Sequence, residues 1–401
     1  MNTFQIIYVV CIIIFLISLI VLLAGVVANN RKKYNTANKN PDNICILIND
    51  IKDSNKLKLL LDSIKEQDYK VNMKDIFIIL DKTDEMPKIV SEFYGINIIN
   101  SNESNFMTKG YILSFAVEEI LKRYKHYDIY FFINSNITLD KSYIKNMVIS
   151  YTKGYNYGIG LKKSKEIYNG FILRRMLFNS IFNINNSIRM KEHKNIYLSS
   201  QAFYISSKII DYYKTFPWHS LNISYEFSVN GMIEGYSSIY NKNAIYYEDI
   251  SDDVIEYNNT RLLKMKGYIA IRKKNRKPLR RFKKKDASIF NELIGLNPLK
   301  IMLLSFIVFY STIVINLFYR LSNNLAIGNH LIYTIAIPLG IYLALLLFTL
   351  VLLIKERINN KFKTRYFIQN LFFFQFFLIS YIGIYINALL PNLKIDEFNN
   401  K

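Results

Sequence analysis

Long apolar runs mark both ends of the chain. The first run extends from Ile6 to Ala28, and residues 1–30 contain no charged side chain. Three further runs lie near the other end, at Ile301–Tyr319, Leu331–Ile354 and Tyr366–Leu390. A helix of about 20 apolar residues crosses the hydrocarbon core of a bilayer. The pattern therefore predicts four transmembrane helices, one N-terminal and three C-terminal.

Polar side chains interrupt the last apolar run. They are the amides Gln369, Asn370, Gln375 and Asn387. A lipid-facing helix avoids such groups, because the hydrocarbon core offers them no hydrogen-bond partners. We therefore expect this helix to face protein or a cavity.

Between the apolar ends, short apolar runs of strand length alternate with segments in which apolar residues recur at helical spacing. The predicted strands are Asn43–Asn49, Asp75–Leu80, Ile96–Ile99 and Asp128–Ile133. The predicted helices are Ser54–Gln67, Pro87–Tyr94, Lys109–Tyr124 and Lys141–Tyr151. Apolar strands alternating with amphipathic helices indicate an α/β fold, with a mainly parallel sheet covered by helices on both faces.

Sheets of this kind bind their ligands beyond the carboxyl ends of the strands. Three polar segments follow predicted strands at that edge: Asn49–Asp50, Asp81–Glu85 and Asn134–Asn136. We expect the functional site among them.

Charge is distributed unevenly along the chain. Lys and Arg number 52 against 31 Asp and Glu, and ten of the basic residues lie in Arg272–Lys285, which has no acid. Lys355–Arg365 holds five basic residues and one acid. Because basic loops stay in the cytoplasm, residues 31–295 are expected there and the N-terminus outside, in a multi-pass protein of the plasma membrane. The basic residues Arg31–Lys33 follow the first apolar run, which favours an uncleaved anchor over a secretory signal.

Composition narrows the choice of partner and class. A basic cluster just cytoplasmic of a span is typical of contact with anionic lipid headgroups, so we favour membrane lipid over nucleic acid as the partner of residues 272–285. The 51% of hydrophobic residues excludes a disordered chain, and two cysteines exclude a disulfide scaffold.

Six short sequences in the middle of the chain occur in the order of a known family. They are IKEQDYK at 64–70, Asp81 with Thr83 to Glu85, KGYIL at 109–113, Phe131–Met147, Ser220–Val229 with Gly231–Tyr240, and Tyr247 with Glu248. This series, spanning roughly residues 43–267, resembles glycosyltransferase family 2, in particular its membrane-integral members, which have the GT-A fold.

The apolar runs, the basic stretch and the resemblance together imply four parts. They are an anchor at 1–30, a cytoplasmic GT-A-like domain at 31–270, a basic juxtamembrane segment at 271–300, and three transmembrane helices with a short tail at 301–401.

The resemblance also implies a nucleotide site in the first half of the domain. Asp81 either binds the base of the nucleotide or caps a turn, and Lys109 either contacts a phosphate or is an ordinary surface lysine. The family's Asp-x-Asp motif, which holds Mg²⁺ or Mn²⁺ on the diphosphate, falls on Asn134, Ser135 and Asn136. Amide oxygens bind hard cations less well than carboxylates. We therefore expect no cofactor, with Mg²⁺ or Mn²⁺ at Asn136 only if the protein is active.

The catalytic base of the family is missing from its expected place. The "TED" motif falls on Asn222, Ile223 and Ser224, and a serine cannot accept a proton at neutral pH. Glu226, two residues on, is either a displaced base or part of a structural ion pair.

The family's acceptor segment, "Q-x-x-R-W", has lost its defining residues. It falls on Thr260–Lys264, where Arg261 and Lys264 can still meet a phosphate. Trp218 either stacks on a sugar or packs in the core.

These losses favour a catalytically impaired relative, a pseudoenzyme tied to surface polysaccharide or glycolipid synthesis. The partners implied are a UDP-sugar or a polyprenyl-phosphate-sugar, and an active transferase or another membrane subunit. One alternative is an active transferase that takes a sugar from a nucleotide-sugar donor and uses relocated catalytic residues. Another is a non-enzymatic membrane protein that binds a nucleotide or a lipid.

Overall fold

The structure is a computed structural model, and it divides the chain into two compact units. We call residues 30–166, 189–293 and 384–401 the sheet unit, and residues 1–29, 167–188 and 294–383 the apolar unit. The residues described are 3–27, 40–51, 53–80, 85–100, 109–192, 194–199, 201–282, 292, 298–325 and 328–390.

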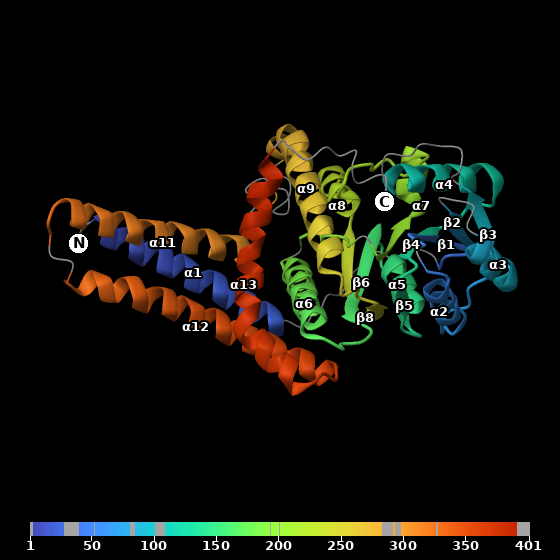
Figure 1. The fold of residues 1–401 in the computed structure, drawn as a ribbon. Helices are drawn as coiled ribbons and strands as arrows, with labels where there is room; N and C mark the ends of the chain where they lie inside the picture. Colours follow the sequence, from blue (N-terminus) through green and yellow to red (C-terminus); the bar gives the residue numbers. More distant parts are fainter. Residues whose placement is uncertain are drawn as a thin grey trace. The chain divides into compact units, whose positions relative to one another are not determined.

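One mixed sheet forms the centre of the sheet unit (Figure 1). Across the described residues it has eight strands in the spatial order β3-β2-β1-β4-β7-β6-β8-β5. The bounds are β1 Ile44–Asn49, β2 Ile76–Leu80, β3 Asn97–Asn100, β4 Ile129–Asn134, β5 Ile137–Leu139, β6 Tyr157–Ser164, β7 Ala202–Ser206 and β8 Ser238–Glu248. Strands β3, β2, β1 and β4 are parallel to one another, and so are β6 and β8. Strand β7 is antiparallel to β4 and β6, and β5 is antiparallel to β8.

The four predicted strands are confirmed to within about one residue at each end as β1 to β4. Every residue of β1, β2, β4 and β7 is buried, as expected for strands covered on both faces. In the core, the rings of Phe132 on β4 and Phe203 on β7 stack with their centroids 5.1 Å apart.

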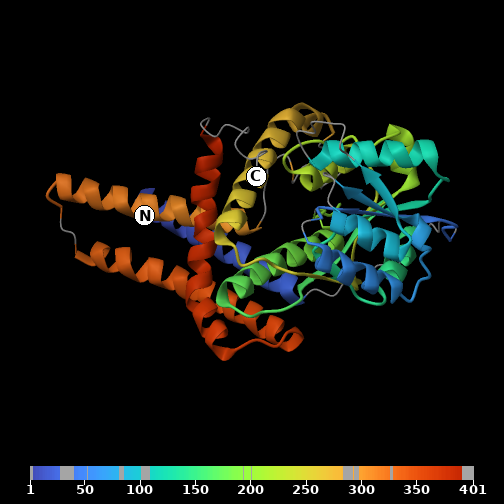
Figure 2. The same ribbon diagram turned by 45° about the vertical axis from the view of Figure 1, so that its right-hand side comes forward.

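Helices cover this sheet on both faces. Their bounds are α2 Ser54–Lys65, α3 Glu85–Tyr94, α4 Lys109–Arg123, α5 Tyr143–Thr152, α7 Ser207–Tyr213, α8 Ile223–Glu234 and α9 Val254–Phe282, with a 3-10 turn η1 at Met73–Asp75. The strand order reverses at β1, so right-handed crossovers put α2 and α3 on one face and α4 on the other. Figure 2 shows strands lying between α2 and α4. The predicted α/β class is confirmed.

Helix α9 carries most of the basic stretch predicted to lie beside the membrane. It runs through Pro278 to Phe282, and residues 283–291 and 293–297 of the expected juxtamembrane segment lie outside the described residues. Glu292 is buried, and its carboxylate accepts hydrogen bonds from the hydroxyls of Tyr197 and Tyr225. Burial raises the pKa of both phenols, so they stay neutral donors to this carboxylate.

The apolar unit contains long helices, most of them rich in apolar residues. They are α1 Thr3–Val27, α6 Gly170–Lys191, α11 Pro298–Ser322, α12 Gly328–Asn359 and α13 Thr364–Leu389. Of the four predicted spans, three contain a described stretch long and apolar enough to cross a membrane, namely α1, α12 and α13. The fourth, α11, holds a shorter apolar stretch at Ile307–Ser322. Helices α1 and α11 pack along each other, with the rings of Tyr8 and Phe309 5.4 Å apart.

The amides of the last predicted span meet protein in part, as expected. Asn370 is fully buried and donates to the carbonyl of Gly170 on α6 at 2.9 Å, while Gln375 donates to Thr349 on α12 at 3.2 Å. Gln369 and Asn387 are exposed. The expectation of a protein-facing helix is thus confirmed for one stretch of α13. The division into two compact units does not test the predicted domain boundaries at residues 30, 270 and 300. It does place residues 167–188 in the same unit as the apolar helices.

Candidate functional site

The carboxyl ends of β1 and β4 meet at the predicted edge of the sheet. Asn49 and Asn134 are partners in the parallel register of these strands. Ser135 connects the loop after β4 to the end of β1 through two hydrogen bonds. Its backbone N–H donates to the carbonyl of Asn49 at 3.0 Å, and its hydroxyl donates to the carbonyl of Asp50 at 2.7 Å. Asp50 has a φ of 61°, in the left-handed region that few non-glycine residues adopt. This turn directs the chain out of the sheet at the candidate site.

Lys109 brings an ammonium group to the same edge. Its Nζ lies 3.2 Å from Asp50 Oδ2 and 3.2 Å from Asn134 Oδ1. The Asn134 amide also donates to Asp50 Oδ2, at 3.4 Å. The side chains of Lys109 and Asp50 are 31% and 40% exposed, so a ligand can reach both. Of the predicted nucleotide-binding residues, the structure therefore brings Lys109 and Asn134 into contact.

On the other side of the loop lies a buried carboxylate, that of Glu248 at the end of β8. The backbone N–H of Asp249 donates to the carbonyl of Asn136 at 3.0 Å, which holds this strand end against the loop. Lys162 on β6 places its Nζ 2.5 Å from Glu248 Oε2, and the two side chains are only 11% and 6% exposed. Gln201 accepts the backbone N–H of Asn134 through its own carbonyl, at 2.8 Å, and its side chain donates to Glu248.

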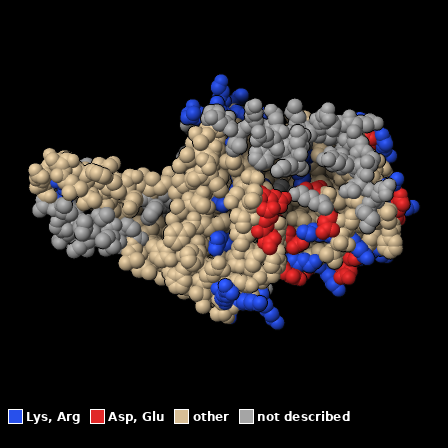
Figure 3. All heavy atoms as spheres, viewed as in Figure 1, with Lys and Arg blue, Asp and Glu red and all other residues tan. Residues whose placement is uncertain are grey.

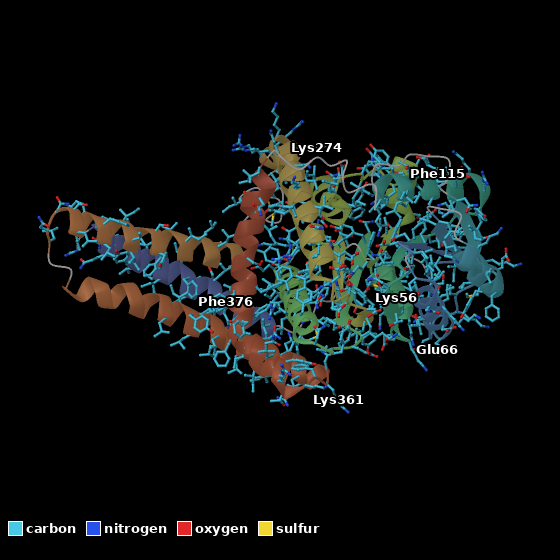
Figure 4. The ribbon with its side chains drawn as sticks, in the orientation of Figure 1. Lys56, Glu66, Phe115, Lys274, Lys361 and Phe376 are labelled. Carbon is cyan, nitrogen blue, oxygen red and sulfur yellow. The ribbon has the colours of Figure 1, made fainter. Side chains whose placement is uncertain are left out.

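Three described carboxylates around the loop each have a lysine partner. Asp50 pairs with Lys109, Glu248 pairs with Lys162, and Asp249 pairs with Lys56 at 2.8 Å (Lys56 is labelled in Figure 4). Among the described residues the site is thus rich in paired charge. Behind it, burial raises the pKa of Tyr246, so this phenol stays protonated beside Ser199.

Three buried amide oxygens at this edge lack a hydrogen-bond partner among the described residues. They are Asn49 Oδ1, Asn136 Oδ1 and Gln201 Oε1. Buried acceptors of this kind are seldom left unsatisfied, because each costs free energy when it leaves water without a donor. Hydroxyl groups of a sugar or a ribose are suitable donors for them.

The loop does not fit a divalent cation. Mg²⁺ and Mn²⁺ favour carboxylate oxygens, whereas Asn134, Ser135 and Asn136 offer two amides and a hydroxyl. The nearby carboxylates of Asp50 and Glu248 already face ammonium groups. Within the described ranges no cluster of three or more His, Cys, Asp or Glu could hold a metal. The arrangement suits an anionic or hydroxyl-rich ligand better than a metal ion.

The expected base region lies at the start of α8. The side chain of Asn222 caps this helix, and the hydroxyl of Ser224 donates to it at 3.4 Å. Glu226 is 5% exposed, accepts the backbone N–H of Ser220 at 2.9 Å, and lies 3.5 Å from the Nζ of Lys274 (Figure 4). The Glu226 carboxylate is therefore engaged by a cation and a backbone donor.

Gly110 holds the base region close to the start of α4. A Cβ built on Gly110 would lie 2.2 Å from the carbonyl oxygen of Trp218 and 2.6 Å from the Cα of His219. The ring of His219 stacks on Tyr111, with centroids 4.2 Å apart, and its Nε2 lies 2.6 Å from the hydroxyl of Ser114. Segment 216–220 is thus packed against the helix that carries Lys109.

The predicted acceptor residues are placed as follows. Trp218 is 2% exposed and surrounded edge-on by the rings of Tyr213, Phe216 and Phe227, so its faces are occupied by the core. Arg261 is buried on α9 and donates to Asn258 at 3.2 Å.

Lys264, also on α9, is exposed, and its backbone carbonyl accepts from Asn222. Asp81 lies outside the described residues. The binding and catalytic roles of all the predicted residues stay predictions.

Sequence reasoning missed Gln201 and Lys162. Lys162 had a detectable signal, since it directly follows the apolar run YGIGL within the same strand, β6. Gln201 had none, because its role depends on the antiparallel pairing of β7 with β4.

Comparisons with known proteins show which fold this arrangement belongs to. No family model and no curated protein matches the sequence. Among solved structures, the mannosyltransferase PcManGT from Pyrobaculum calidifontis, in complex with GDP-Man and Mn²⁺, is similar over 96% of this chain and 100% of its own, with 11% identity and a TM-score of 0.61.

Two further structures align less closely. Glucosyl-3-phosphoglycerate synthase from Mycobacterium tuberculosis aligns with 10% identity over 57% of this chain and 78% of its own, at a TM-score of 0.42. TarS of S. aureus aligns with 14% identity over 57% and 40%, at a TM-score of 0.35.

The first alignment carries the argument, because it extends over nearly the whole of both chains. It shows a GT-A-like fold together with apolar helices, as the sequence predicted. At 11% identity the alignment shows the fold, and it shows neither membership of family 2 nor the activity of this chain.

Proposed function

We propose that the protein is a membrane-bound, glycosyltransferase-like protein that binds a nucleotide sugar at the carboxyl edge of its sheet and is impaired in sugar transfer. Its place is in surface polysaccharide or glycolipid synthesis, as a non-enzymatic partner of an active transferase or another membrane subunit. The observation that carries the proposal is the loop Asn134–Asn136, whose amides and hydroxyl stand at the ligand edge, with the described carboxylates Asp50, Glu248 and Asp249 each paired to a lysine.

Two features support nucleotide-sugar binding. The structure that aligns over the whole chain is described in complex with GDP-Man. The unsatisfied oxygens of Asn49, Asn136 and Gln201 are acceptors that sugar or ribose hydroxyls can satisfy.

Impaired transfer follows from what the residues can do chemically. Ser224 is not a base at neutral pH, and Glu226 is held by Ser220 and Lys274. A positioned acid or base contributes about 10²–10⁴-fold to a rate, so its loss alone leaves very slow transfer. The metal that would stabilise the leaving diphosphate also lacks its carboxylate ligands.

The test combines binding with turnover. We expect the purified full-length chain to bind UDP or GDP in calorimetry and to release no sugar from UDP-glucose, UDP-N-acetylglucosamine or GDP-mannose, with or without Mg²⁺ and Mn²⁺. Absence of binding to either nucleotide would contradict the proposal and favour a lipid-binding role. An intact transferase that co-purifies with the chain would support the partner role.

One observation favours the alternative of an active transferase. Glu226 is a buried carboxylate only two residues beyond the expected base position, and a small movement of the exposed Lys274 side chain would leave it with the Ser220 N–H alone. Turnover that Glu226→Gln abolishes, but Glu234→Gln at the far end of α8 does not, would establish this alternative.

A further inference from the structure

We propose that the site binds the diphosphate of its ligand without a divalent cation, and that the ammonium group of Lys109 supplies the positive charge in its place. This rests on the proposed function, because it specifies how the nucleotide diphosphate is held. It also departs from the solved structure aligned above, which is described with Mn²⁺.

The position of Lys109 is the first argument. Its ammonium group lies 3.2 Å from one carboxylate oxygen and 3.2 Å from one amide oxygen, on the two strand ends that flank the ligand edge. A divalent ion bound by Asp50 and Asn134 would have to occupy the same space. The Lys109 ammonium group therefore already binds the two oxygens that a metal ion would need as ligands.

The donor capacity of Lys109 is the second argument. An ammonium group has three N–H donors, and described residues accept from it at Asp50 and Asn134 only. One N–H is thus available to a phosphate oxygen, and the side chain is 31% exposed toward solvent. Because Lys109 begins α4, the ammonium also lies at the positive end of a helix 15 residues long, which favours an anion there.

The pairing of Glu248 is the third argument. This carboxylate, unlike that of Asp50, is buried, and Lys162 neutralises it at 2.5 Å. The Gln201 side chain donates to it as well. A metal would therefore have to break an enclosed ion pair to gain a second carboxylate ligand.

The experiment measures nucleotide affinity with and without metal, on the full-length chain in lipid nanodiscs. The probes are UDP and GDP in excess Mn²⁺ or in EDTA, together with inorganic diphosphate in EDTA. We expect the affinity in EDTA to lie within about threefold of that in Mn²⁺. Lys109→Gln should weaken binding roughly tenfold, the size of one lost charge-assisted hydrogen bond, and Lys109→Arg should restore part of it.

A matched control lies on the same helix. Lys122 is a surface lysine of α4 that pairs only loosely with Glu119, at 3.8 Å, so Lys122→Gln should leave the affinity unchanged. The double variant Lys109→Gln with Asn134→Asp exchanges the ammonium for a second carboxylate. We expect this variant to bind the nucleotide only with Mn²⁺ and to give a bound-Mn²⁺ signal in electron paramagnetic resonance that the natural chain lacks.

The outcomes separate the inference from the proposed function. Nucleotide binding that Mn²⁺ tightens tenfold or more would overturn the inference and leave the proposed function standing. Binding of inorganic diphosphate in EDTA that Lys109→Gln removes, with neither nucleotide bound, would support the inference and overturn nucleotide binding. No binding of any probe would overturn both.

Discussion

The ion pair between Lys162 and Glu248 is enclosed, with side chains only 11% and 6% exposed. Removing one partner leaves the other as an uncompensated buried charge, which typically costs about 3–5 kcal/mol. We predict that Lys162→Met lowers the stability of the sheet unit by this order, measured as a lower midpoint of thermal unfolding. The matched control is Lys163→Met, one residue along the same strand and on its opposite face, which should be nearly neutral.

Restoring neutrality should restore stability. In the double variant Lys162→Met with Glu248→Met, no charge is left without a counter-ion, so most of the loss should be recovered. If Lys162→Met, Glu248→Met and the double variant all unfold at the same temperature as the natural chain, the ion pair makes no energetic contribution. The description of the site as held by paired charges would then be wrong.

Gly110 gives a second prediction in which two effects oppose each other. In an exposed helix position, Gly→Ala stabilises by roughly 0.5–1 kcal/mol. Here the added methyl would meet backbone atoms of Trp218 and His219 at 2.2 and 2.6 Å, so part of the structure must shift. We predict that Gly110→Ala destabilises the chain and weakens nucleotide binding, because Lys109 is the adjacent residue.

The comparison for this variant is Gly340→Ala in α12. A Cβ there meets no atom within 4 Å, so the ordinary helix preference should act alone. Equal unfolding temperatures for Gly110→Ala and the natural chain would show that the segment carrying Trp218 adjusts easily, contrary to the packing described.

At the scale of elements, α13 carries polar groups that need partners. Asn370 donates to Gly170 and accepts from the Nε of Arg174 at 3.2 Å, both on α6. Asn370→Leu leaves these buried groups unsatisfied, at a cost of about 1–3 kcal/mol. We predict a lower thermal stability in detergent for this variant. Asn387→Leu, at an exposed position of the same helix, should not lower it.

The elements that the sequence predicted best are those whose pattern is local. Strands β1, β2 and β4 are largely apolar runs, and the long apolar helices are evident from length and composition. Helix α6 was not predicted, because its sequence mixes arginines and asparagines with apolar residues, and its partner α13 lies about 200 residues away. Tertiary contacts decide such a segment, not its own periodicity.

The candidate site also has parts that the sequence predicted and parts that it did not. The segments after β1 and β4 were predicted, because parallel strands present their carboxyl ends at one edge. The contribution of Lys162 depends on the register of β6 with β8, which shifts between Gly160 and Leu161. A shift of one residue moves a side chain to the other face of a sheet, and nothing in the local sequence reveals it.

At the scale of the whole molecule, charge separates the two units. Figure 3 shows acidic and basic side chains on the visible face of the sheet unit, whereas the visible face of α11 carries almost none. Three helices of the apolar unit, α1, α12 and α13, have stretches long and apolar enough to cross a membrane. The basic loops then predict which side each connection occupies.

Sidedness can be tested with single cysteines. The link after α11 should be outside and the link after α12 inside, because the segment Lys355–Arg365 around the latter holds five basic residues and one acid. We predict that Asn323→Cys reacts with a membrane-impermeant maleimide on intact cells, and that Lys361→Cys reacts only after permeabilisation. Both positions are exposed, and Lys361 is labelled in Figure 4.

The natural chain is a suitable background for this experiment, because its own thiols are protected. Cys45 is fully buried in β1, and Cys11 is 7% exposed in α1. Burial raises the pKa of the Cys45 thiol, which further lowers its reactivity. If Lys361→Cys were the variant that reacts on intact cells, the sheet unit would lie outside. Cytoplasmic nucleotide sugars would then be out of its reach, and the proposed function would need an extracellular ligand for the same loop.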